Sequence, residues 1–151
     1  MTATQKETIA VLNDLIETSK DGEKGFMACA NDVKNVELKQ VLTKHSQECA
    51  QAAAELQTEV RALGGEAENS TSVSADLHRH WVDLKSMVTG KSEEAILNEA
   101  ERGEDHAKAV YEKALKKDLP SNVRSIVERQ YHGVQRNHDQ VKALRNIARA
   151  S

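Results

Sequence analysis

The sequence predicts an all-α protein: a bundle of four long helices with a shorter helix in the connection between the second and the third. The chain has 151 residues, which suits one domain that buries a core without a disulfide or a metal. It contains one Pro, one Trp, two Tyr and one Phe, whereas β-sandwiches and barrels need frequent turn residues and β-branched or aromatic runs. Apolar residues recur at steps of three and four, the period of an amphipathic helix.

The first long helix is predicted over residues 5–30. Thr4 and Glu7 have the spacing of a capping box, in which a hydroxyl and a carboxylate satisfy backbone N–H groups of the first turn. The apolar stripe of this helix comprises Ile9, Leu12, Ile16, Phe26 and Ala30. The polar segment over residues 31–35 then predicts a turn.

The second long helix is predicted over residues 35–63. Asn35 or Asp32 has the type of side chain that caps a helix N-terminus. Gly64 and Gly65 end the helix, because glycine tolerates the left-handed conformation that is common at helix C-termini.

Two further long helices are predicted over residues 93–117 and 120–149. Ser92 supplies a hydroxyl cap for the first of them, and two glutamates follow at the positive end of the helix dipole. Pro120 begins the last helix, because proline fits the first turn of a helix but not its interior.

A shorter helix is predicted over residues 73–89. If it crosses back along the bundle, its length of ~25 Å makes the second and third long helices parallel, which is the ferritin-like connection. The alternative is a fifth element at one end of an up-down-up-down bundle. The length of the segment favours the crossover and therefore a ferritin-like four-helix bundle.

Charge and apolar patterning narrow the classes of partner. The 21 Lys and Arg against 24 Asp and Glu leave a net charge of -3 without a basic block, so nucleic acid is not an expected partner. The longest apolar stretch, Phe26–Ala30, is too short to cross a membrane, and the N-terminus lacks the layout of a signal peptide. A cytoplasmic location is expected. Cys29 and Cys49 are too far apart in this fold for a disulfide.

Several polar residues fall where the helical period demands apolar ones. Glu23, His45, Glu104 and His138 lie on the inner seams of the four helices, and Glu101 lies at the edge of one. If the second and third long helices are parallel, all five lie within about one helical turn of the same height. Buried carboxylates and imidazoles are costly unless they are paired or bound to a metal, so the five predict a metal site.

Mixed Glu and His ligands suit iron, manganese or zinc, and carboxylate-rich sites favour iron and manganese. The alternative is a set of buried ion pairs without metal, for which Arg102 and Arg136 are available.

The chain also resembles a known family in six segments that occur in order. They are Leu12–Glu17, Lys20–Phe26, Glu55–Gly65, His78–Trp81, Glu101–Asp105 and Glu128–Tyr131. On these segments the chain resembles a bacterial ferritin-like four-helix-bundle family of uncharacterised proteins, which carries a domain-of-unknown-function label. The resemblance implies a ferritin-like bundle and no settled activity.

Ferritin-like di-iron proteins carry a Glu on each of two helices and a Glu-x-x-His on each of the other two. By this resemblance, Glu23 and either Glu101 or Glu104 match the single glutamates. The pairs depart from the pattern, because the motif that begins at His45 is His-Ser-Gln-Glu and the motif that begins at Glu128 is Glu-Arg-Gln-Tyr. A reduced, single-metal or lost site is the expected variant.

Two functions therefore remain in view. The first is a metal-binding ferritin-like protein that holds iron or a similar ion for storage, detoxification or oxidation under stress. If it is an enzyme, it is an iron-dependent oxidase of ferroxidase type, but a binder is favoured. The second is a non-catalytic structural or partner-binding bundle without metal. Analogy with ferritin relatives suggests a homodimer.

Overall fold

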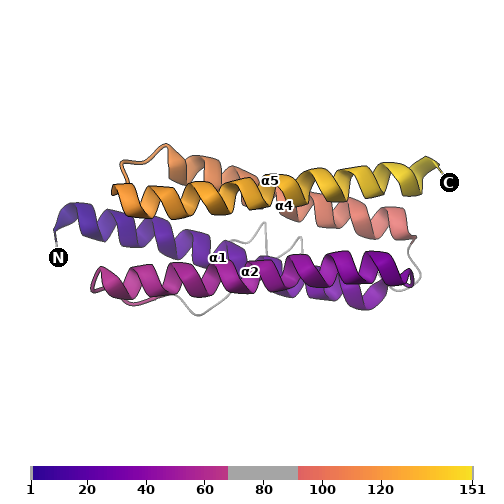
Figure 1. Cartoon of the computed structure of the whole chain (residues 1–151), viewed down its shortest axis with the longest axis horizontal. Coiled ribbons are helices and arrows are strands. Elements are labelled where there is room, and N and C mark those ends of the chain that lie inside the picture. Colours follow the sequence, from indigo (N-terminus) through magenta and orange to yellow (C-terminus); the bar gives the residue numbers. More distant parts are fainter. Residues whose placement is uncertain (1, 68–91, 151) are drawn as a thin grey trace.

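The computed structural model describes residues 2–67 and 92–150, and these two ranges form four helices without a strand. The helices are α1 (Ala3–Asp32), α2 (Val36–Ala62), α4 (Glu93–Leu115) and α5 (Ser121–Ala150). They lie along a common long axis as a four-helix bundle (Figure 1). The shorter helix predicted over residues 73–89 lies outside the described residues.

The caps of α1 and α2 show how the sequence sets the first hairpin. The Thr2 hydroxyl accepts from the Gln5 backbone N–H at 3.1 Å, and the Gln5 side chain accepts from the Thr2 backbone N–H at 2.8 Å. The capping box predicted at Thr4 is therefore wrong by two residues, because glutamine reaches back to the cap as well as glutamate does. Asn35 caps α2 as predicted, accepting from the Leu38 backbone N–H at 3.1 Å. Gly64 follows α2 with a φ of 83°.

Two apolar clusters at opposite ends of the bundle define the direction of each helix. One cluster combines the end of α1 and the start of α2 with the start of α4 and the end of α5. The other combines the start of α1 and the end of α2 with the end of α4 and the start of α5. Figure 1 shows the same arrangement, with α2 and α4 running in one direction and α1 and α5 in the other. The predicted parallel arrangement of the second and third long helices is thus confirmed.

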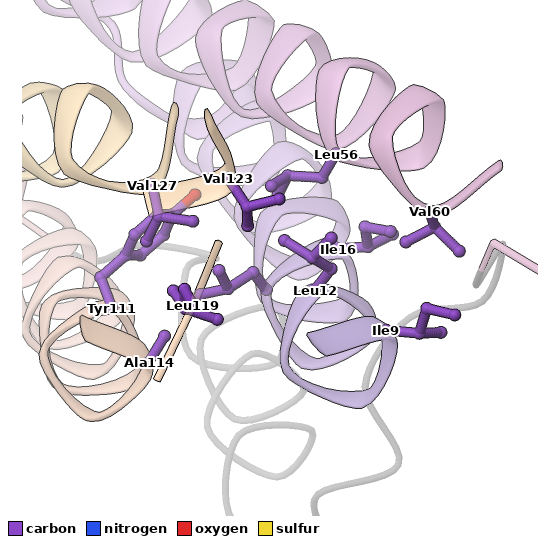
Figure 2. Packing of buried hydrophobic residues seen from close by; sticks show 11 residues of the cluster. Ile9, Leu12, Ile16, Leu56, Val60, Tyr111, Ala114, Leu119, Val123 and Val127 are labelled. Carbon is purple, nitrogen blue, oxygen red and sulfur yellow. The ribbon is translucent and has the colours of Figure 1, made fainter. Parts of the chain in front are cut away.

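The second cluster brings together buried apolar side chains from both helical hairpins (Figure 2). Leu12, Ile16, Leu56 and Val60 have no exposed surface. Burial of each such side chain stabilises the fold by roughly 1.5–3 kcal/mol. Its described members are Ile9, Leu12, Leu15, Ile16, Leu56, Val60, Tyr111, Ala114, Leu119, Val123 and Val127.

Polar side chains occupy the inner face between the two clusters. His45 is 1% exposed and Glu104 is 3% exposed, so the helical period placed both of them correctly inside. Helices α1 and α2 pack closely, as do α4 and α5, whereas α2 and α5 are the most loosely packed of the neighbouring pairs. Within the described ranges, no helix combines the length and the apolar character of a membrane span.

Candidate metal centre

Three ligand-type side chains meet between α4 and α5. Glu101 and Asp105 lie four residues apart on α4 and therefore on one face of the helix. His138 of α5 points its Nε2 at both of them, at 3.8 Å from Glu101 Oε1 and 2.5 Å from Asp105 Oδ1. One ligand atom of each residue lies within 4.8 Å of the other two, so the three form a candidate metal site.

Two further charged residues orient this group. Asp139 Oδ1 lies 3.3 Å from His138 Nδ1, so a proton on Nδ1 is directed at a carboxylate. With that proton in place, the lone pair of Nε2 faces Glu101 and Asp105, which is the tautomer that a metal ligand needs. The Arg145 guanidinium donates to Glu101 Oε2, and Glu101 Oε1 is left facing His138.

A second pair lies deeper in the bundle, between α2 and α4. His45 Nδ1 lies 3.7 Å from Glu104 Oε1, which is too long for a hydrogen bond. Within the described part of the chain, neither atom has another hydrogen-bond partner. His45 Nε2 lies 2.9 Å from Gln140 Oε1, an atom that only accepts, so Nε2 carries the proton.

Burial controls the charge of this inner pair. Desolvation lowers the pKa of His45 below its usual 6.5. Desolvation, reinforced by the nearby Glu48 and Asp105 carboxylates, raises the pKa of Glu104 to about 8. Both side chains are therefore neutral at pH 7, and the pair is not a charged salt bridge.

One family model matches this chain over residues 7–117, a range that contains α2, α4 and nearly all of α1. The family is described as "Domain of unknown function (DUF2383)". The chain belongs to the DUF2383 family. The match contains Glu101 and Asp105, whereas His138 lies beyond it on α5. No curated protein matches the sequence.

In this DUF2383 chain, the five residues predicted to form one site fall into separate groups. Glu101 faces His138, and Glu104 faces His45. Glu23 lies on the adjacent α1, where its backbone carbonyl accepts from the Ser46 hydroxyl at 2.7 Å. The metal-binding role of all five stays a prediction.

Sequence reasoning missed Asp105, Asp139 and Arg145. The signal for Asp105 is its spacing of four from Glu101, which places two carboxylates on one helix face. The sequence offered Arg102 and Arg136 as ion-pair partners for the five predicted site residues. In the structure Arg102 pairs with Glu99 at 2.9 Å, and Arg145 pairs with Glu101.

Proposed function

We propose that this DUF2383 chain is a ferritin-like bundle that binds a divalent metal ion of iron type, with Glu101, Asp105 and His138 as the ligands. The observation that supports this most is the position of His138 between three carboxylates. Its Nε2 faces two of them and its Nδ1 faces Asp139, a carboxylate–histidine arrangement that is typical of metal sites.

The spacing of the ligand atoms suits such an ion. Bonds of ~2.1 Å separate neighbouring ligands of a metal by ~3 Å and opposite ligands by ~4.2 Å. The observed separations of 2.5 and 3.8 Å bracket the first of these values, so side-chain shifts of about 1 Å suffice. Two carboxylates with one imidazole favour iron or manganese, with zinc as an alternative.

The local charge also favours a dication. Glu101, Asp105 and Asp139 carry three negative charges, and Arg145 carries one positive charge. The acids therefore exceed the arginine by two charges, which a divalent ion neutralises. Arg145 binds the oxygen of Glu101 that faces away from His138, so the guanidinium need not leave when a metal enters.

The inner residues are proposed as a weaker position. A metal bound by His45 Nδ1 and Glu104 must displace the proton of Glu104, whose pKa is raised to about 8. The outer ligands are more exposed than His45 and Glu104, so less desolvation opposes the entry of an ion there and they fill first. Glu23 is proposed to contribute from α1 only when the inner position is occupied.

The ferritin-like assignment is supported by topology. Helices α2 and α4 are parallel, so the connection between them joins opposite ends of the bundle, as in ferritin-like folds. A single-metal site lacks the second ion of a di-iron oxidase, so we infer iron binding rather than turnover. Oxygen-dependent oxidation of Fe(II) by the loaded protein would identify an enzyme instead.

Elemental analysis tests the proposal. Protein purified without a chelating tag is stripped with EDTA and dialysed anaerobically against Fe(II), and iron per chain is measured. We expect about one ion per chain, and a loss of at least tenfold in affinity for His138→Gln. His132→Gln is the matched control, because His132 is an exposed histidine on the same helix. Its ring contacts Gln135 Oε1 at 3.4 Å and the Tyr131 ring at a centroid distance of 6.0 Å, and neither residue is a proposed ligand. Equal retention by the two variants, or none by the wild type, would contradict the proposal.

A metal-free bundle is the second candidate, and one contact favours it. Asp105 Oδ1 lies 2.5 Å from His138 Nε2, close enough for a charge-assisted N–H···O hydrogen bond. In that case the group is an ion-paired seam between α4 and α5, and the function is structural or partner binding. Absence of bound iron in the dialysis experiment is its expected outcome.

A further inference from the structure

A cavity of about 470 Å³ lies inside the bundle and is lined by all four helices. Glu101, Asp105 and His138 do not line it, so it is separate from the outer metal ligands, whereas Glu104 of the inner pair does line it. Its middle is apolar and is formed by Phe26, Cys49, Ala52, Ala107 and Val134. The space lies where α2 and α4 contribute the small side chains of Ala52 and Ala107, whereas larger side chains fill the two ends of the core.

The opening of this cavity lies between α2 and α5, the most loosely packed of the neighbouring helix pairs. Two polar bridges cross this gap: Asn137 Nδ2 donates to Glu48 Oε2 at 2.8 Å, and Gln130 Nε2 donates to Glu55 Oε1 at 2.7 Å. On each helix the bridges are seven residues apart, which corresponds to ~10 Å along the axis. Gly133 lines the cavity between them and has no side chain to close the gap.

The cavity contains one buried polar group that needs a partner. Glu104 is 3% exposed and lines the cavity, and its Oε1 has no hydrogen-bond partner within the described residues. Buried polar atoms without a partner are rare and costly. A hydroxyl group both donates and accepts, so it satisfies a carboxyl group in either protonation state.

The charges on the cavity wall exclude a strongly charged ligand. Two acids, Glu48 and Glu55, are balanced by Arg129 and Arg136, and Arg129 already pairs with Glu55. A ligand carboxylate placed beside Glu104 would meet a second carboxyl group in an apolar surrounding.

We propose that this cavity binds a small uncharged amphiphile, with its aliphatic body between Phe26, Ala52, Ala107 and Val134 and a hydroxyl group at Glu104. The volume of about 470 Å³ lies within the ~300–1,000 Å³ that small-molecule sites occupy. The site is independent of metal binding at the outer residues, and it adds a ligand class to the proposed function.

Calorimetric titration with 1-octanol tests the site. The blocking variant is Gly133→Leu, which places a side chain in the gap between the bridges. A Cβ at this position meets only Arg136 Nη2 at 3.7 Å, an ordinary contact, and loss of a mid-helix glycine favours the helix. We therefore expect the variant to fold, which circular dichroism checks, and its affinity for octanol to fall at least tenfold. Ser125→Leu adds the same side chain at an exposed position of α5 and should leave the affinity within about twofold.

Two further measurements test the polar end. Glu104→Leu removes the hydrogen-bond partner and should weaken octanol binding about fivefold, the value of one hydrogen bond. Octanoate should bind the wild type at least tenfold more weakly than octanol. Failure of octanol to bind the wild type, unchanged binding to Gly133→Leu or Glu104→Leu, or octanoate binding as tight as that of octanol would each overturn the proposal.

Discussion

Burial of Glu104 makes the stability of this protein depend on pH, and Glu104→Gln isolates that effect because it keeps the shape and removes the titration. The pKa of Glu104 is raised from 4.5 to about 8 in the folded protein, mainly by desolvation. Between these values the folded state binds the proton more tightly than the unfolded chain does. The free energy of unfolding therefore falls as the pH rises from 4.5 towards 8.

His45 acts in the opposite direction at lower pH. Its pKa is lowered from 6.5 by burial, so the unfolded chain binds a proton more tightly and stability falls as the pH drops below 6.5. Of this pair, Glu104 makes the larger contribution between pH 6.5 and 8, because the unfolded His45 side chain loses its remaining proton soon above pH 6.5. At 1.36 kcal/mol per pKa unit, this window corresponds to a loss of about 2 kcal/mol.

Urea unfolding of the metal-free protein at pH 6.5 and pH 8.0, followed by circular dichroism, measures the loss. We expect about 2 kcal/mol for the wild type and a much smaller change for Glu104→Gln. Glu112→Gln, the same substitution at an exposed position of α4, should behave as the wild type does. If the wild type and Glu104→Gln lose the same free energy over this window, the burial argument is refuted.

Three other substitutions test the fold, each by urea unfolding at a fixed pH. Leu12→Ala empties a site with no exposed surface and should cost about 2–5 kcal/mol; a loss below ~1 kcal/mol would mean that the second cluster is loosely packed. Tyr111→Phe removes the hydroxyl that donates to Gln130 Oε1 at 2.7 Å and should cost about 1 kcal/mol, so a neutral result would argue against that bond. Asn35→Ala removes the cap that accepts from the Leu38 N–H and should also cost about 1 kcal/mol, whereas an unchanged midpoint would place the start of α2 elsewhere.

Much of the fold could be predicted from the sequence because the apolar period is strong. The steps of three and four placed all four described helices to within two residues at each end. The same period identified His45 and Glu104 as inner residues. Folding each helix back on the next also predicted the height of each residue along the bundle axis. It placed His45 and Glu104 at the same height, which agrees with the 3.7 Å separation of His45 Nδ1 and Glu104 Oε1.

The outer group was harder to predict, for a physical reason. Asp105, Asp139 and Arg145 lie on polar edges of α4 and α5, where a charged side chain faces either water or the neighbouring helix. The rotation of α4 against α5 decides between the two, and packing sets that rotation rather than the local pattern. The cap of α1 was missed because Thr2 and Thr4 both begin capping-box patterns, and the helix starts at the earlier one.

The central claim, metal binding between α4 and α5, is tested most directly by anaerobic calorimetric titration of the metal-free protein with Fe(II). We expect one ion per chain for the wild type and for His132→Gln, and affinity at least tenfold weaker for His138→Gln. Titration curves that show no binding, or binding that His138→Gln leaves unchanged, would contradict it.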